Sequence, residues 1–203
     1  MEAVARACRE ERINARVAVV VSDRADAGGL AIAKNLGIET SVVPRDTFPD
    51  RAAFERALSE RIDAHGADVI VLAGFMRVLS PDFVERYAGR VINIHPALLP
   101  KYRGLNTHTR VLAAADREHG ASVHFATAEL DGGPVVLQSR IAVRPAENEH
   151  ELARRVLTTE HVILPKVLGW LADGRLLWRD GKGWLDGRPL DAPVIEHFGE
   201  AQD

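Results

Sequence analysis

The chain has 203 residues, of which 46% are hydrophobic and 27% charged, and its net charge is −3. This composition is that of a globular protein, excludes a disordered or fibrous chain, and favours a single domain over residues 1–203. The near-neutral charge argues against nucleic acid as a partner. The one cysteine, Cys8, excludes an intrachain disulfide and a cysteine-rich zinc site, and we expect no metal. No apolar run approaches the ~20 residues of a membrane span, so we expect a cytoplasmic protein without a membrane partner.

The first half of the chain alternates short apolar runs with longer amphipathic ones. Apolar residues at helical spacing predict helices, and short β-branched runs predict strands, mostly buried on both faces. The predicted helices are residues 2–12, 25–36, 50–65, 81–87 and 107–118. The predicted strands are residues 16–22, 40–43, 67–73 and 91–94. This alternation predicts a parallel sheet flanked by helices.

The pattern changes after residue 120. Strands at 121–127 and 135–143 follow each other without a helix between them, which predicts antiparallel pairing. A long amphipathic helix is expected over residues 149–172, and residues 174–203 are expected to form a hairpin and tail. The fold class is therefore α/β, with a Rossmann-like, mainly parallel sheet flanked by helices and an antiparallel C-terminal section.

Asn93 and His95 make up the densest group of residues that could carry chemistry. They lie two positions apart in a predicted strand, so their side chains share a face at the strand end where α/β sheets place ligands. An amide donor beside a titratable imidazole suits the stabilisation of an oxyanion and the transfer of a proton. The alternative is an asparagine that caps the strand end and a structural histidine.

Asp131 lies in the turn-forming segment 129–134. One interpretation is that it caps the turn through its side chain. The other is that it folds back against His95 and favours the charged imidazole. His124, in the preceding strand, is interpreted as a residue that contacts the site residues rather than the substrate. The alternative is that it is simply a packed polar residue. The histidine spacings match no metal motif.

Taken together, these segments resemble the folate-dependent formyltransferases, and within them the phosphoribosylglycinamide formyltransferase family. The similarity extends from about residue 2 to about residue 190. The segments that carry it are 68–79 (DVIVLAGFMRVL), 93–102 (NIHPALLPKY), 107–108 (TH), 119–125 (HGASVHF) and 129–134 (ELDGGP).

The resemblance implies a formyltransferase-type fold and transfer of a formyl group from 10-formyltetrahydrofolate to phosphoribosylglycinamide, in purine biosynthesis. It implies that Asn93, His95 and Asp131 are catalytic and that Glu160 binds the amine substrate. No metal is implied, and the oligomeric state stays open. The folate-binding positions implied in the same way are Arg51, Met76, Arg77, Val78, Leu79 and Asn93.

The chain departs from the family at its start, because the family begins with a strand and a phosphate-binding loop. Residues 2–13 resemble the helix that follows that loop, so we expect an apolar vacancy beside residues 16–22. Two alternatives follow: an inactive or truncated folate-binding protein, or a related folate formyltransferase or deformylase.

Overall fold

The computed structural model describes residues 1–75 and 77–199. Its helices are α1 (Glu2–Arg9), α2 (Gly28–Asn35), α3 (Arg51–Ala64), α4 (Pro81–Arg86), α5 (Thr107–Ala113) and α6 (Glu149–Ala172), with a short 3₁₀ helix η1 (Arg45–Thr47). Its strands are β1 (Val20–Ser22), β2 (Thr40–Val42), β3 (Ile70–Leu72), β4 (Val91–His95), β5 (Glu118–Phe125), β6 (Val135–Ala142), β7 (Leu176–Arg179), β8 (Lys182–Leu185), β9 (Arg188–Pro189) and β10 (Val194–His197).

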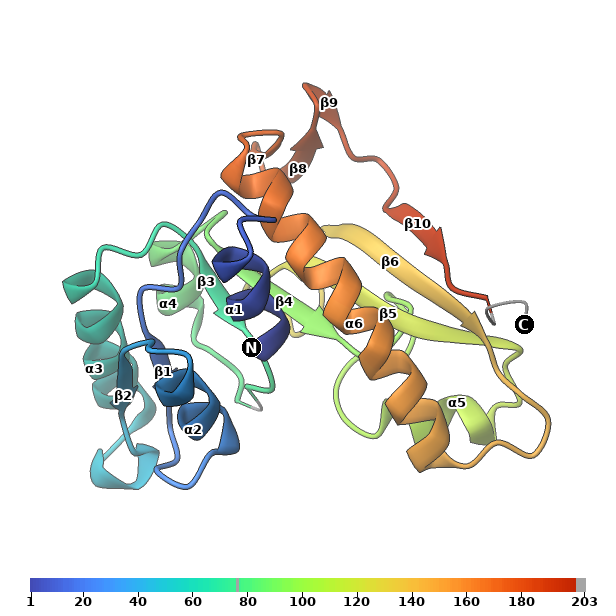
Figure 1. Ribbon diagram of the computed structural model, residues 1–203, viewed down its shortest axis with the longest axis horizontal. Coiled ribbons are helices and arrows are strands. Elements are labelled where there is room, and N and C mark those ends of the chain that lie inside the picture. The colour runs from blue at the N-terminus through green and yellow to red at the C-terminus, as the bar shows by residue number, and fades with distance from the viewer. Residues whose placement is uncertain (76, 200–203) are drawn as a thin grey trace.

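The central layer is a five-stranded sheet in the order β10-β6-β5-β4-β3, beside a separate two-stranded sheet of β1 and β2 (Figure 1). The pairs β1–β2, β3–β4 and β6–β10 are parallel. The pairs β4–β5 and β5–β6 are antiparallel. The predicted α/β class, with parallel strand pairs and an antiparallel section, is therefore confirmed.

Helix α6 covers β5 and β6 and forms the core with them (Figure 1). Asn148 begins it with a capping box, in which its side chain accepts from the Glu151 N–H and the Glu151 carboxylate accepts from the Asn148 N–H. The apolar stripe of this amphipathic helix is buried at Leu152, Val156, Ile163, Val167 and Trp170. The observed helix has the predicted bounds. The apolar spacing and the N-terminal cap both specify them.

The predicted strand at 16–22 is shorter than expected and is not buried. Only Val20–Ser22 forms β1, and its residues are half-exposed. β1 pairs with β2 alone, and β3 pairs with β4 alone. Among residues 1–75 and 77–199, no strand pairs with the other edge of either one. Because a β-branched run is buried on both faces only within a covered sheet, an apolar strand at an edge stays half-exposed.

Two further predictions are corrected by the structure. The helix predicted over 107–118 ends at Ala113, and the chain enters β5 at Glu118, because antiparallel pairing with β6 extends that strand. The predicted tail is also more ordered than expected. β7, β8 and β9 form a small antiparallel sheet, and β10 pairs parallel with β6 as an edge of the central sheet. In the described part of the chain, no helix is long and apolar enough to cross a membrane.

Backbone amides of β1 should exchange with solvent faster than those of β5. β1 is half-exposed and has one hydrogen-bonded neighbour, whereas β5 lies between β4 and β6 and is buried from His119 onward. Hydrogen–deuterium exchange followed by mass spectrometry, with β5 as the internal reference, measures the difference. Equal protection of the two strands would contradict this expectation.

Candidate active site

Strand β4 places Asn93 and His95 on one face at its carboxyl end. The strand lies between β3 and β5, so its backbone is held by hydrogen bonds on both sides. His95 is 5% exposed. The pairing of β4 explains why these two side chains can project from a rigid element, as a reactive group requires.

Asp131 reaches the same place from the turn between β5 and β6. Its φ of 48° lies in the left-handed region, which is uncommon for a residue other than glycine. Its Oδ2 accepts a hydrogen bond from the Gly104 N–H at 2.9 Å and lies 3.4 Å from Nδ1 of His95. Its Oδ1 lies 3.4 Å from Nδ2 of Asn93. The structure therefore brings Asn93, His95 and Asp131 together.

Both ring nitrogens of His95 face oxygen acceptors. Nε2 donates to the Tyr102 carbonyl at 2.9 Å, and Nδ1 faces the carboxylate of Asp131. An imidazole with an acceptor at each nitrogen can donate from both when it is charged. Each ring nitrogen of His95 therefore has an oxygen to which an N–H can donate.

His124 orients the amide of Asn93. Its Nδ1 lies 2.9 Å from the Phe125 carbonyl, which only accepts, so Nδ1 carries the proton. Burial lowers the pKa of His124, so the ring is neutral and Nε2 accepts from Nδ2 of Asn93 at 3.0 Å. The second N–H of that amide is then directed toward Asp131.

A buried polar network holds the loop that follows His95. Ser122 donates to the Ala97 carbonyl at 2.7 Å and accepts from the Leu99 N–H at 3.1 Å. Gln138 donates to the Leu99 carbonyl at 2.7 Å and to the Ser122 hydroxyl at 3.0 Å. With its polar groups paired in this way, the loop is fixed relative to β5 and β6.

His108 and His119 form a second histidine pair near His95. Nδ1 of His108 lies 2.9 Å from Nε2 of His119, and the rings meet edge to face. Burial, helped by the nearby His108 and His95, lowers the pKa of His119 from its usual 6.5 to about 4. Burial also lowers the pKa of His108. The pair therefore stays neutral at pH 7 and adds no positive charge beside His95.

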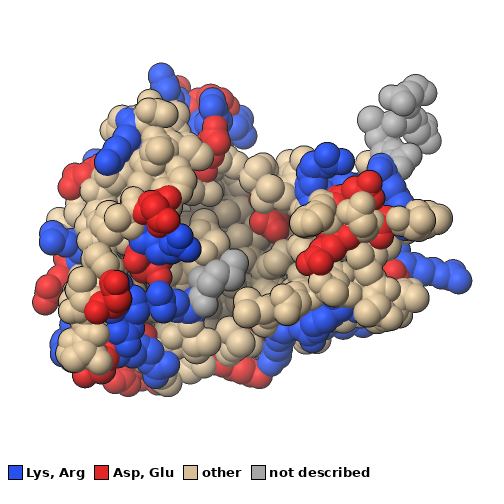
Figure 2. Space-filling model, turned by 90° about the horizontal axis from the view of Figure 1, so that it is seen from below, with Lys and Arg blue, Asp and Glu red and all other residues tan. Residues whose placement is uncertain are grey.

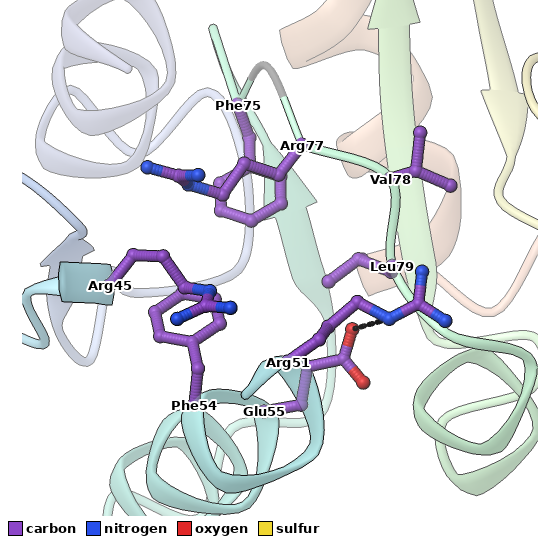
Figure 3. Close-up of a pocket in the computed structure, with 8 residues that line it drawn as sticks. All are labelled: Arg45, Arg51, Phe54, Glu55, Phe75, Arg77, Val78 and Leu79. Carbon is purple, nitrogen blue, oxygen red and sulfur yellow. Dashed lines mark ion pairs between the residues drawn. The ribbon is translucent and has the colours of Figure 1, made fainter. Parts of the chain in front are cut away.

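Four of the implied folate-binding residues, Arg51, Arg77, Val78 and Leu79, line a pocket of about 300 Å³ (Figure 3). Met76 lies outside the described residues. Figure 2 shows the lower face hollowed between its left and right parts, with basic side chains on the left part. The lining residues are Arg45, Arg51, Phe54, Glu55, Phe75, Arg77, Val78 and Leu79.

A second pocket adjoins the first and contains the polar cluster. Both pockets are lined by Phe75, Arg77, Val78 and Leu79. The second is also lined by the cluster residues Asn93, His124 and Asp131. The two pockets together can hold a ligand whose reacting end lies at Asn93 and whose other end lies among arginines.

Glu160 lies apart from this cluster, on α6 where α1 packs against it. Burial raises the pKa of its carboxyl group, and the nearby Met1 amine opposes that shift. Among the described residues, no hydrogen bond or ion pair joins Glu160 to Asn93, His95 or Asp131. The structure therefore does not bring Glu160 into contact with the other implied site residues.

Sequence reasoning missed several groups that shape the site. The Gly104 N–H and the Tyr102 carbonyl are backbone groups, which no side-chain pattern reveals. Arg45 and Phe54 come from η1 and α3, and their spacing carries no motif. Within the described residues, no group of three or more His, Cys, Asp or Glu could hold a metal ion.

Comparison with known proteins identifies the class to which this fold and site belong. Residues 1–168 match the family model described as formyl transferase, so the chain belongs to the formyl transferase family. The chain is 50% identical over 190 residues to phosphoribosylglycinamide formyltransferase of Escherichia coli, covering 94% of this chain and 90% of that protein.

Two further comparisons agree with that relative. The structure superposes on phosphoribosylglycinamide formyltransferase of Coxiella burnetii with a TM-score of 0.91 and 45% identity, covering 96% of this chain and 92% of the other. The trifunctional purine biosynthetic protein adenosine-3 of Bos taurus is 37% identical over 86% of this chain and 17% of its own length. These findings favour an active formyltransferase over the alternatives raised by the sequence.

The buried His119 should make folding stability fall in acid. Between pH 6.5 and about 4 the unfolded chain binds a proton that the folded chain excludes at this position. This difference in pKa corresponds to a loss of about 3 kcal/mol of unfolding free energy as pH falls through that range. Urea unfolding at several pH values should show a flatter dependence for His119→Gln than for the wild type.

The matched control is His150→Gln, because His150 is exposed on α6. It should leave the pH dependence unchanged. The same slope in His119→Gln and in the wild type would show that His119 is not the residue responsible.

Proposed function

We propose that this protein transfers the formyl group of 10-formyltetrahydrofolate to the amine of phosphoribosylglycinamide. The products are the N-formyl compound and tetrahydrofolate, and the reaction belongs to purine biosynthesis. Membership in the formyl transferase family and the names of the relatives support this assignment. The observation that carries it is the cluster of Asn93, His95 and Asp131, of which Asn93 and Asp131 line one of two adjoining pockets and His95 lies buried beside Asp131.

The cluster has the groups that formyl transfer to an amine requires. Attack of the amine nitrogen on the formyl carbon moves the carbonyl electrons to oxygen and forms a tetrahedral oxyanion. Donors placed in advance at that oxygen stabilise it. Asn93 has one N–H engaged with His124 and a second in a long 3.4 Å contact with Asp131. The second N–H is the one that can turn to the oxyanion.

His95 and Asp131 divide the proton transfers in this proposal. The bond between the formyl carbon and N10 of the folate breaks, and the His95 imidazolium gives its proton to the leaving nitrogen. Asp131 accepts the proton lost by the amine, through a water molecule. The 3.4 Å separation of the imidazole and carboxylate then allows His95 to be recharged from Asp131.

The shapes of the two pockets support a folate donor. A folate has a flat ring system that carries the formyl group and a tail that ends in carboxylates. The pocket at Asn93 adjoins the pocket that contains Arg51 and Arg77. In our proposal the ring system occupies the pocket at Asn93 and the tail occupies the arginine-lined pocket, because guanidinium groups pair well with carboxylates.

Glu160 is proposed to bind the amine substrate. Its carboxyl group is half-buried on α6, and burial raises its pKa. A carboxylate in such surroundings gains from accepting hydrogen bonds from the ribose hydroxyl groups of that substrate. This role is independent of the folate pockets, since Glu160 lines neither of them.

Substitutions in the cluster should abolish most of the proposed activity. We expect Asn93→Ala to lower kcat by about 10²–10³, as for loss of an oxyanion donor. We expect His95→Ala and Asp131→Asn to lower it by about 10²–10⁴, as for loss of an acid or base. The assay follows formation of tetrahydrofolate from 10-formyltetrahydrofolate with phosphoribosylglycinamide, and circular dichroism checks folding.

The control variant for this assay is His150→Gln, on the exposed side of α6, which should keep wild-type activity. A folded wild-type protein without any transfer to phosphoribosylglycinamide would refute the proposal. Hydrolysis of the formyl donor without transfer would favour a deformylase instead.

Glu160→Gln should weaken binding of the amine substrate and spare the folate. We expect KM for phosphoribosylglycinamide to rise about tenfold, since a hydrogen bond to a charged group contributes about 1.5–3 kcal/mol. The Kd for tetrahydrofolate should not change. Glu60→Gln, exposed on α3, is the control. An unchanged KM would remove Glu160 from the substrate site.

A further inference from the structure

The loop after β4 carries two of the groups that surround His95 and Asp131. The Tyr102 carbonyl accepts from Nε2 of His95 at 2.9 Å, and the Gly104 N–H donates to Oδ2 of Asp131 at 2.9 Å. The same carboxylate oxygen lies 3.4 Å from Nδ1 of His95. The surroundings of both ring nitrogens of His95 therefore depend on the position of one short segment, residues 101–104.

Tyr102 adopts a backbone conformation that has to be sustained by contacts elsewhere. Its φ of 57° lies in the left-handed region, which is costly for a bulky residue and persists only where the surroundings fix it. Arg110 of α5 supplies part of that support. Its Cζ lies 5.3 Å from the centroid of the Tyr102 ring, and its Nη1 donates to the Arg103 carbonyl at 2.7 Å. Contacts of the Tyr102 side chain thus help to hold the carbonyl that faces His95.

Asp116 binds the polar end of the Tyr102 side chain. Its Oδ2 accepts from the Tyr102 hydroxyl at 2.9 Å and from Nζ of Lys101 at 3.0 Å. The hydrogen bonds from Lys101 and Tyr102 lower the pKa of the Asp116 carboxyl group, and the bond to Asp116 raises the pKa of the Tyr102 phenol. At neutral pH the carboxylate therefore accepts and the phenol donates, which makes this a charge-assisted hydrogen bond.

The early end of α5 places Asp116 in a turn rather than in a helix. The sequence predicted a helix to residue 118, but α5 ends at Ala113 and Asp116 lies in the turn before β5. Ala115, just before it, has a φ of 51°, so the chain direction changes here. Asp116 lines neither of the two pockets. Any effect of its side chain on the reaction is therefore transmitted through the residues that it contacts.

We propose that Asp116 is a positioning residue that acts on His95 through Tyr102. The inference rests on the proposed function, in which His95 gives its proton to the leaving nitrogen. Asp116 holds the Tyr102 side chain, so the Tyr102 carbonyl stays at Nε2 of His95 and the ring keeps Nδ1 toward Asp131. Without Asp116 the 101–104 segment gains freedom, and the ring has the orientation needed for proton transfer for a smaller fraction of the time.

Steady-state kinetics of Asp116→Ala and Tyr102→Phe test the proposal. We expect each substitution to lower kcat about tenfold, the loss typical of a hydrogen bond to a charged group, and to leave KM for 10-formyltetrahydrofolate unchanged. In a His95→Ala background the same substitutions should lower kcat no further, because the effects of residues that act as one unit do not add. An equal loss of kcat with and without His95 would overturn the proposal.

Asp63→Ala is the matched control, because Asp63 has the same kinds of partner at a distance from the site. Its Oδ1 accepts from the Tyr87 hydroxyl at 2.8 Å and its Oδ2 from Nη2 of Arg86 at 2.6 Å, and it lines neither pocket. We expect this variant to lose folding stability in urea as Asp116→Ala does, but to keep the wild-type kcat. An equal loss of kcat in both variants would show a general effect of stability and would also overturn the proposal.

The Nε2–H proton of His95 provides a measurement that does not require activity. Because this proton faces the Tyr102 carbonyl, it should exchange slowly with water in the wild type and in Asp63→Ala, and faster in Asp116→Ala. Proton–nitrogen NMR of protein with ¹⁵N-labelled histidine measures the exchange, and His95→Ala assigns the signal. Equal exchange in the wild type and Asp116→Ala would overturn the inference alone. A protected proton in a wild type that transfers no formyl group would instead overturn the proposed function.

Discussion

The site depends on the contacts that the buried carboxylate of Asp131 makes with its neighbours. At 7% side-chain exposure it contacts the Gly104 N–H, Nδ1 of His95 and Nδ2 of Asn93. A carboxylate buried at this depth is costly unless donors surround it. The turn that carries Asp131, the loop after β4 and β4 itself are therefore held in one arrangement, and the left-handed backbone of Asp131 is sustained by the same contacts.

The two pockets differ in charge, and this difference favours one orientation of a bound ligand. The pocket at Asn93 is also lined by the neutral His124 and by Asp131. This lining suits a reacting group that is uncharged when it binds. Beyond Val78 the lining becomes cationic. In the proposed function, a ligand with an uncharged reacting end and an anionic tail has its tail among the arginines, so recognition of the tail also positions the formyl carbon.

The sequence pattern correctly predicted an element that is specified by residues close together in the chain. Helix α6 was predicted to its observed ends because the Asn148 cap and a regular apolar stripe agree. The strand at 16–22 and the helix at 107–118 were predicted too long. Each depends on pairing with distant residues: β1 has a partner on one side only, and β5 is extended by β6. Hydrogen bonds between distant segments produce no periodic pattern in the sequence of either segment.

By itself the sequence predicted the fold class and singled out Asn93, His95 and Asp131 as candidate site residues, because two-residue spacing in a strand and turn chemistry are local properties. Only the tertiary structure decided that Asp131 meets His95 rather than capping its turn. It also placed Arg45 of η1 in the same pocket as Arg77, whereas Glu160 lines neither of the two pockets. These outcomes depend on how the sheet, the loops and α6 pack, since contacts between residues far apart in the chain are set by the whole fold.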